Sequence, residues 1–187
     1  MSALRMGVRM FRLAPAAALL AAASITFAAP AAVSQKGTDH LIKEVRHEIL
    51  MQPYYGVFDN VAYRVDGYKV TLLGQVTRPV LKSNIEKAVK GIEGVESVNN
   101  QIEVLPLSPN DDSIRLAAYR AIYGYPALQR YGLNTIAPIR IVVKNGNITL
   151  EGVVANEGDK NMIGIRANGV SGAFKVTNNL RLDSDSK

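Results

Sequence analysis

Apolar residues alternate with other residues in two neighbouring stretches of the chain, and a turn signal lies between the stretches. The alternating apolar positions are Val61, Tyr63, Val65, Val70, Leu72 and Val76. Because successive side chains of a strand point to opposite faces of a sheet, this period predicts two half-buried strands. Asp66-Gly67 between them is a hairpin signal. We therefore expect an antiparallel hairpin.

The same pattern returns at a shift of 78 residues. Its apolar positions are Ile139, Ile141, Val143, Ile148, Leu150 and Val154, with Asn145-Gly146 as the turn. Residues 61–104 align with the second copy without a gap, and about 11 of the 44 aligned positions are identical. The chain therefore contains a duplicated module, which is longer than solenoid repeats of about 20 to 50 residues.

A helix is predicted before each hairpin, because apolar residues recur there at helical spacing. In the first copy we expect Thr38 or Asp39 to cap this helix and Pro53 to end it. In the second copy we expect the helix to start at Asn110 to Asp112, where the two aspartates favour its first turn. Gly124 and Pro126 are expected to stop it.

A second helix and a third strand complete each copy. Pro79 suits the first turn of the second helix in copy one, and its counterpart is expected near Asp159 to Asn168. The crossover helix predicts a third strand parallel to the second. The predicted fold class is α+β: two tandem α-β-β-α-β modules, each a three-stranded mixed sheet with two helices on one face.

The N-terminal segment has the pattern of a secretory signal peptide. Arg5, Arg9 and Arg12 precede an uncharged apolar run that extends from Leu13 to about Ala29. This run is shorter than the roughly 20 residues that a membrane span needs. We therefore predict that a cleaved signal exports the chain and that the mature protein is soluble outside the cytoplasm. The alternative is anchoring by an uncleaved N-terminal helix.

These observations predict the organisation of the whole chain. The expected segments are a signal peptide over 1–31, a first module over 38–105, a linker over 106–110, a second module over 111–183 and a tail over 184–187. Each module is small enough for its core to be marginal alone, so we expect the two to pack together.

Composition excludes several classes of function. Without the three signal arginines, the formal charge of +6 falls to about +3, too little for nucleic-acid binding. The chain has no cysteine, and its only histidines are His40 and His47. These two and Glu44 suit a solvated helix face better than a metal site. We expect no enzymatic activity, no metal and no cofactor.

Repeated glycine and asparagine positions favour structural roles. Gly91 and Gly169 are expected to end helices in a left-handed conformation. Gly74 and Gly152 suggest close approach by a helix. At inward positions of the last strand, Asn100 and its counterpart Asn178 are expected to satisfy nearby backbone groups.

Aromatic and basic residues gather around the first helix of copy two and the loop after it, which is five residues longer than in copy one. The candidate site for a lipid or a partner protein consists of Arg115, Tyr119, Arg120, Tyr123, Tyr125, Arg130 and Tyr131. Tyrosine beside arginine suits a membrane interface. One alternative is that these tyrosines cover the core with their hydroxyls in water. Another concerns a second, less basic cluster in the matching loop of copy one, which could equally be the contact between the copies: Tyr54, Tyr55 and Phe58.

Three recurring motifs resemble the BON domain of bacterial envelope proteins. They are the Leu-x-Gly-x-Val at Leu72–Val76 and Leu150–Val154, the Gly-x-x-Gly turn, and the closing Val-x-Asn-x-Ile/Leu-x-Val/Leu. Tandem BON domains are typical of osmotically inducible periplasmic proteins and envelope-integrity proteins. The resemblance implies a periplasmic, peripheral protein with a non-enzymatic role in binding phospholipid or envelope protein. An extracellular location is the alternative.

Two hypotheses remain open at this stage. The first is a protein that associates with anionic phospholipid and supports envelope integrity or stress tolerance. The second is an interaction or chaperone-like module whose open sheet face or edge strand accepts a segment of an envelope protein. The aromatic and basic cluster favours the first hypothesis.

Overall fold

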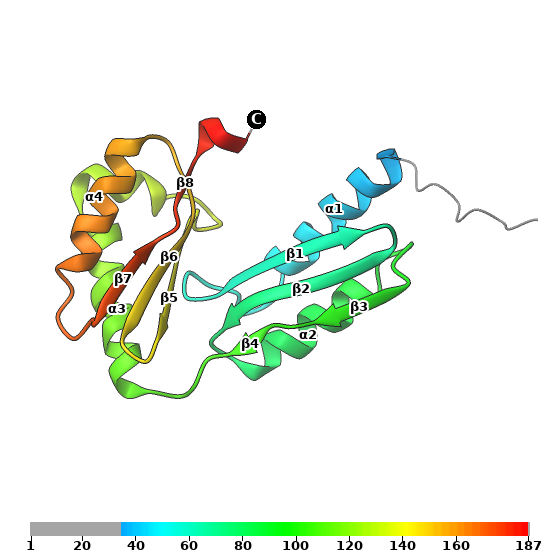
Figure 1. Cartoon of the computed structure of the whole chain (residues 1–187), viewed down its shortest axis with the longest axis horizontal. Helices are drawn as coiled ribbons and strands as arrows, with labels where there is room; N and C mark the ends of the chain where they lie inside the picture. The colour runs from blue at the N-terminus through cyan, green and yellow to red at the C-terminus, as the bar shows by residue number, and fades with distance from the viewer. Residues whose placement is uncertain (1–34, 187) are drawn as a thin grey trace, which may run out of the picture. The chain divides into compact units, whose positions relative to one another are not determined.

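A computed structural model describes residues 35–186, and the predicted signal peptide lies outside these residues. The first module consists of α1 (Gln35–Leu50), β1 (Asn60–Asp66), β2 (Lys69–Val76), α2 (Pro79–Lys90), β3 (Ser97–Asn100) and β4 (Glu103–Val104). In Figure 1, α1 and α2 lie on the same face of their sheet. The order of elements in this module is the one that the sequence predicts.

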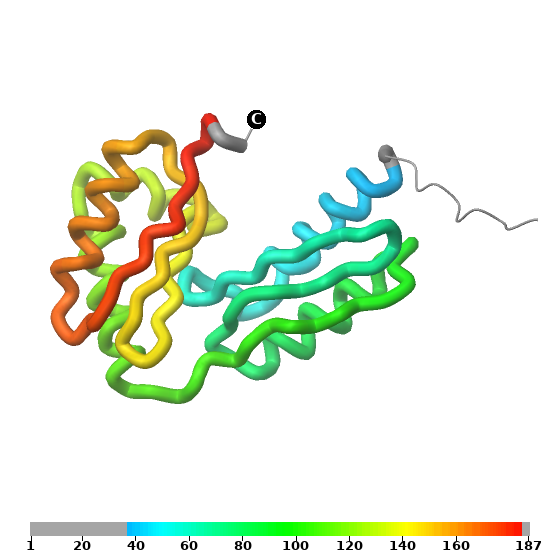
Figure 2. The backbone as a smooth tube through the Cα atoms, in the orientation of Figure 1, coloured from blue at the N-terminus to red at the C-terminus, as the bar shows by residue number. Residues whose placement is uncertain are grey.

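The second module repeats this order with added 3₁₀ turns. It consists of α3 (Pro109–Tyr123), η1 (Pro126–Tyr131), β5 (Ile139–Lys144), β6 (Asn147–Val154), α4 (Glu157–Asn168), β7 (Lys175–Asn178), β8 (Arg181–Leu182) and η2 (Asp183–Ser186). The backbone tube follows the same helix, hairpin, helix and final-strand course in each module (Figure 2). The α+β fold with two tandem modules is therefore confirmed.

The sheets of the two modules have the same register at the shift of 78 residues. Val61 pairs with Gly74 in the antiparallel hairpin of the first module, as Ile139 pairs with Gly152 in the second. The last strand is parallel to its neighbour, as predicted: Val70 pairs with Val98. The duplication therefore preserves the pairing between strands as well as the hydrophobic pattern.

The third strand of each sheet consists of two short segments, the first of which ends at an asparagine, and both segments pair with the central strand. Asn100 Nδ2 donates to Lys82 O at 3.1 Å, and Asn100 Oδ1 accepts from Ile102 N at 3.1 Å. Asn178 makes the equivalent bonds to Lys160 O and Leu180 N. The predicted role of these asparagines is confirmed, and each joins the last strand to the helix that packs over it.

Each module has its own hydrophobic core between its helices and one face of its sheet. In the first, Val45, Leu72 and Ile85 are fully buried. In the second, Ile122, Leu150 and Ile163 occupy the core. Burying such side chains stabilises a fold by about 1.5–3 kcal/mol each.

The hairpin glycines Gly74 and Gly152 are needed for a reason that differs from the prediction. They have φ values of +113° and +126°, and a Cβ there would lie 2.1 Å from Asn60 O and 2.0 Å from Pro138 O. The group that approaches closely is therefore the backbone at the start of the neighbouring strand, and the predicted approach by a helix is wrong.

The predicted left-handed helix ends at Gly91 and Gly169 are also wrong. These residues have φ values of −81° and −80°. The positive φ values occur three residues later, at Gly94 and Gly172. The glycine that needs conformational freedom is therefore the second of each Gly-x-x-Gly turn, where the chain turns towards its last strand.

Three predicted boundaries shift by a few residues. α1 extends N-terminal of Thr38 and Asp39, so neither caps it, and it ends at Leu50, before Pro53. α3 begins at Pro109, with the Ser108 hydroxyl accepting from Asp111 N. In the first hairpin Asp66 pairs with Lys69, so the turn residues are the two that follow Asp66.

Candidate functional site

The seven candidate residues of the second module have different environments. Arg115, Tyr123 and Tyr131 are buried, Tyr125 is half-buried, and Tyr119, Arg120 and Arg130 are exposed. The Tyr123 hydroxyl donates to Ile139 O at 2.6 Å, and burial raises its pKa to about 12. Tyr123 therefore ties α3 to β5 rather than facing solvent.

Tyr131 also has a structural environment. Its hydroxyl accepts from Ala155 N at 2.9 Å and bonds to the carboxylate of Asp159. In the first module the equivalent backbone amide, Thr77 N, donates to the buried carboxylate of Asp59 at 2.7 Å. The two modules thus satisfy the same amide at the end of a strand with different side chains.

Arg115 points into the second module. Its guanidinium pairs with Asp112 and donates to Val143 O at 2.7 Å. Its Nε is the one fully buried side-chain nitrogen or oxygen without a hydrogen-bond partner among residues whose side chains are described. Arg115 therefore joins α3 to β5 and is not available to a membrane surface.

Two further residues of the predicted cluster have partners within the module. Arg130 lies over the ring of Tyr131 and pairs with Asp159. Its bonds to Tyr131 and Asp159 raise its pKa. The Arg166 guanidinium lies over the Tyr125 ring, 4.5 Å from the ring centroid. The structure thus divides the cluster into local pairs, which reduces its free positive charge.

Tyr119 and Arg120 remain at the surface. The Tyr119 ring lies 5.0 Å from that of Tyr123 and 6.2 Å from that of Phe58 in the first module. Part of the predicted cluster is therefore a contact between the two copies, the alternative that the sequence left open. Arg120 is exposed and makes no ion pair within the described part of the chain.

The loop after α1 contacts β5, and both modules belong to one compact unit of the chain. Ile141 N donates to Val57 O at 2.8 Å, and Arg140 Nη1 donates to Gly56 O at 2.7 Å. Consequently β5 is buried at every position from Ile139 to Val143, whereas β1 alternates between half-buried and exposed positions after Asn60 and Val61.

A cavity of about 270 Å³ lies at this contact. Its lining includes Tyr55, Tyr119, Tyr123, Asn134, Ile136 and Arg140. The Arg140 guanidinium lies 4.7 Å from the centroid of the Tyr55 ring. Arg140 is only 8% exposed, and among the described residues no carboxylate pairs with it.

Sequence analysis missed Arg140, although one signal for it was present. The corresponding residue of the first copy, 78 positions earlier, is Ala62. A charged residue that replaces alanine early in a strand, in only one of two copies, indicates a feature specific to that copy.

Apolar side chains lie beside this cavity on the long loop of the second module. Gly132, Asn134, Thr135, Ile136 and Ala137 all contribute to its lining. Leu133, within the same run, is 86% exposed, and Ile136 is 43% exposed. An anionic ligand in the cavity would therefore have apolar side chains next to it.

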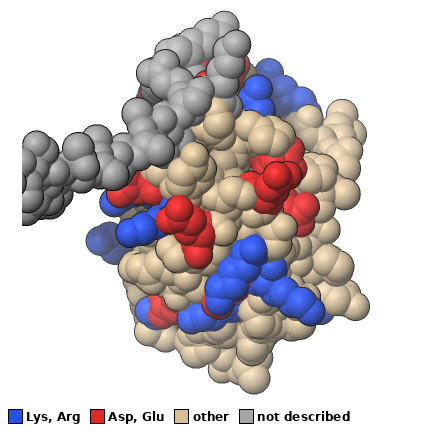
Figure 3. All heavy atoms as spheres, turned by 90° about the vertical axis from the view of Figure 1, so that its right-hand side faces the viewer, with Lys and Arg blue, Asp and Glu red and all other residues tan. Residues whose placement is uncertain are grey.

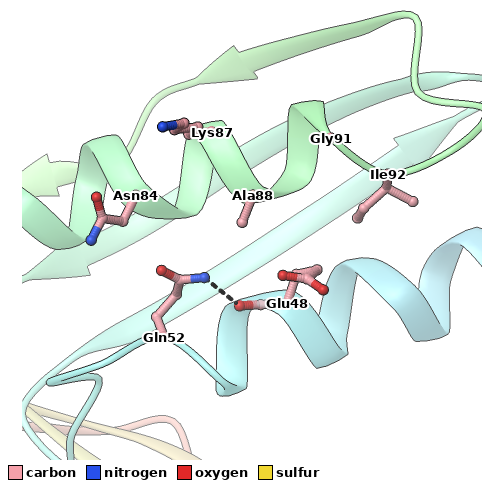
Figure 4. A pocket seen from close by; sticks show the side chains of 7 residues that line it. All are labelled: Glu48, Gln52, Asn84, Lys87, Ala88, Gly91 and Ile92. Atoms are coloured by element: carbon pink, nitrogen blue, oxygen red, sulfur yellow. Dashed lines mark hydrogen bonds between the residues drawn. The ribbon is translucent and has the colours of Figure 1, made fainter.

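A second hollow lies between α1 and α2 of the first module (Figure 4). It is a wide groove of about 420 Å³. Gln52 Nε2 on one wall donates to Glu48 O at 3.0 Å, and Asn84 and Lys87 lie on the other. Its charged side chains, Glu48 and Lys87, have opposite signs, so the groove has no preference for one sign of ligand.

Charge is divided unequally between the modules. The second has nine Lys and Arg against six Asp and Glu over residues 109–183, whereas the first has eight against nine over 38–105. By these counts, the second module is the one that an anionic surface would attract. On the face shown in Figure 3, acidic and basic side chains are interspersed, with no large patch of one sign.

Two other kinds of site have no support in the part of the chain that the structure describes. None of its helices has the length and apolar character needed to cross a bilayer. Nor does any cluster of three His, Asp or Glu side chains within residues 35–186 form a candidate metal site.

Comparison with known proteins identifies both modules. The family model for the BON domain matches residues 38–106 and 127–184. The comparison with curated proteins gives no match.

Two solved structures share a distant likeness with the chain. The C-terminal domain of CdsD, the structural protein of the type III secretion system of Chlamydia trachomatis, is 16% identical, with coverage of 76% of this chain and 96% of that chain and a TM-score of 0.28. A second CdsD structure is 13% identical, with coverage of 79% and 95% and a TM-score of 0.27. Likenesses this weak support no conclusion about function.

Proposed function

The chain belongs to the BON-domain family, and from this membership we propose that it is a non-enzymatic envelope protein that associates peripherally with anionic phospholipid. BON domains are generally non-catalytic and are associated with envelope and osmotic-stress proteins. An envelope location and a binding role are therefore the premises of the proposal. The proposal adds that the ligand is a lipid surface and that the second module contacts this surface.

The observation that carries the proposal is the exposed apolar and aromatic surface beside the cavity. It consists of Tyr119, Leu133 and Ile136, which are 42%, 86% and 43% exposed. Inserting such side chains among lipid headgroups removes apolar area from water, at about 25 cal/mol per Å². Tyrosine also suits the boundary between headgroups and acyl chains.

The charge of the second module supports an anionic rather than a neutral membrane. Its surplus of basic residues and the exposed Arg120 would attract acidic lipid, at about 1 kcal/mol for each cation near the surface. Because salt screens such attraction, binding should weaken as ionic strength rises. The proposed contact surface is therefore Tyr119, Arg120, Leu133 and Ile136.

Co-sedimentation with vesicles tests the proposal. Wild-type protein should bind phosphatidylglycerol-containing vesicles more strongly than pure phosphatidylcholine vesicles, and it should lose binding at high salt. Leu133→Asp should weaken binding about tenfold or more, because it removes an apolar contact and adds a negative charge that the anionic lipid repels. Leu107→Asp is the matched control, since Leu107 is 96% exposed and lies between the modules in sequence.

Absence of vesicle binding by the wild-type protein, or equal binding by both aspartate variants, would contradict the proposal. The first result would leave recognition of an envelope protein as the better account of the fold.

A further inference from the structure

Arg140 is a buried cation without an anionic partner. Its Nη1 donates to Gly56 O, and its plane lies over the Tyr55 ring. A guanidinium has five N–H donors, so most of them have no acceptor in the protein. An arginine this buried ordinarily pairs with a carboxylate, because an isolated charge is costly to remove from water.

The nearby acid, Asp59, is already occupied. Its carboxylate accepts from Gly56 N at 2.9 Å, from Thr77 N at 2.7 Å and from Thr77 Oγ1 at 2.8 Å. It makes no ion pair with Arg140 in the described part of the chain. Asp59 thus orders the loop that supplies Gly56 O, and the other donors of Arg140 stay free.

Those donors are accessible from the cavity. Each Arg140 side-chain nitrogen either makes a hydrogen bond or is accessible to solvent. Arg140 also contributes to the cavity lining, together with Tyr55 and Tyr123. Its unused N–H groups therefore face the cavity, where a ligand can accept from them.

Tyr123, which is buried, and Tyr55, which is half-buried, add polarity without adding negative charge. Burial raises the pKa of Tyr55 above its ordinary value, and Tyr123 has a pKa of about 12, so both are neutral near pH 7. The Tyr55 oxygen accepts from Val61 N at 3.2 Å, which leaves its proton available for donation. The Tyr123 proton is used on Ile139 O, so the cavity offers the Tyr55 hydroxyl and the unused Arg140 N–H groups as donors, together with a positive charge. An oxyanion requires this combination.

We infer that this cavity binds a phosphate group, which Arg140 holds through its free guanidinium donors. At about 270 Å³ the cavity is slightly smaller than ordinary small-molecule sites, which suits a headgroup better than a whole lipid. This inference deepens the proposed function. The claim that the phosphate belongs to a lipid rests on that function. Leu133 and Ile136 would contact the apolar part next to the phosphate.

Phosphate can come from a phospholipid headgroup or from free phosphate, and two arms of one experiment distinguish these sources. In the first arm, sodium phosphate is titrated into the protein at low ionic strength and followed by calorimetry. In the second arm, co-sedimentation with phosphatidylglycerol-containing vesicles is measured. Arg140→Gln and Arg140→Lys are compared with wild type in both arms.

Arg181→Gln is the matched control, because it removes the same charge from an exposed position of the second module. Arg140→Gln should weaken binding about 10- to 100-fold, the loss expected for a charge-assisted hydrogen bond. Arg140→Lys should retain part of the binding, and Arg181→Gln should stay within about twofold of wild type. Circular dichroism and thermal unfolding show whether each variant is folded.

A second variant guards against a structural effect of losing Arg140. Ala137 lines the cavity and is half-buried. Ala137→Leu narrows the cavity and leaves the bond between Arg140 and Gly56 O intact. Loss of phosphate or vesicle binding in this variant, with thermal unfolding unchanged, is the expected result.

The outcomes separate the inference from the proposed function. If wild type binds vesicles and folded Arg140→Gln and Ala137→Leu bind them equally well, the inference is overturned and the lipid association stands. If wild type binds free phosphate through Arg140 but binds no vesicles, the site is confirmed with a soluble ligand and the proposed function fails. If wild type binds neither probe, both are overturned.

Discussion

Replacing Gly152 by alanine should destabilise the second module more than replacing any nearby glycine. Gly152 has φ +126°, and its Cβ would lie 2.0 Å from Pro138 O, a backbone atom that cannot rotate away. Strain from the backbone conformation costs about 1–3 kcal/mol. Displacing β5 would also weaken the bond from Val153 N to Pro138 O, at roughly 1 kcal/mol.

The expected loss is therefore about 3 kcal/mol in the free energy of unfolding, a large fraction of the 5–15 kcal/mol typical of a domain. In a chain of this size it corresponds to a melting temperature lower by roughly 10 °C. Urea unfolding followed by circular dichroism measures it directly. Because the chain contains no tryptophan, fluorescence is the weaker probe.

Gly169→Ala is the matched control. Gly169 has φ −80°, and the nearest atom to its Cβ position, Arg166 O, is 3.6 Å away, which is ordinary contact. Its substitution should change the free energy of unfolding by no more than about 0.5 kcal/mol. The reasoning is refuted if Gly152→Ala unfolds at the same urea concentration as wild type, or if Gly169→Ala is the more damaging change.

Two further predictions concern buried polar groups of the second module. Asp111→Ala should lower the free energy of unfolding by about 2–3 kcal/mol in urea titrations, because Asp111 accepts from Asn145 N at 2.9 Å and from Gly146 N at 2.8 Å; an unchanged midpoint would contradict this role. Tyr123 keeps its proton in the folded state up to a pKa of about 12, whereas an unfolded tyrosine ionises near pH 10. The stability that protonated Tyr123 contributes is therefore full below about pH 10, and it is lost as the pH rises from about 10 through 12. Between pH 9 and 11.5, wild type should lose about 2 kcal/mol more than Tyr123→Phe, and parallel losses would refute the assignment.

The sequence predicted the duplication and the sheets because both depend on local period. Alternation at Val61, Tyr63 and Val65 identifies a strand whatever surrounds it, and the common shift of 78 residues fixes the second copy. The roles of Asn100 and Asn178 followed from their inward positions, because a polar side chain turned towards the core bonds nearby backbone groups. Such features need no knowledge of long-range packing.

The candidate site was harder to predict because it depends on where side chains point. Tyr119 and Tyr123 are one helical turn apart, yet Tyr119 is exposed and Tyr123 is buried against β5. Composition identified an aromatic and basic region but not its internal pairs, such as Arg115 with Val143 O. The length of the loop after η1 indicated that copy two differs there, without showing what it encloses.

Arg140 could not be assigned from local pattern because its burial comes from a distant segment. Gly56 and Val57 of the first module contact β5 and cover positions whose equivalents in β1 are only half-buried or exposed. The period of β5 therefore gives no sign that Val142, on the outer face, is buried as well. Only comparison of Ala62 with Arg140 between the copies marks the position.

The most direct test of lipid association is to map the contact on the isotope-labelled protein by amide chemical shifts during titration with phosphatidylglycerol-containing bicelles. The account predicts shifts concentrated at residues 119–120 and 132–137, with smaller changes on pure phosphatidylcholine bicelles. Shifts confined to the first module, or no shifts on either bicelle, would contradict the claim that the second module contacts anionic phospholipid.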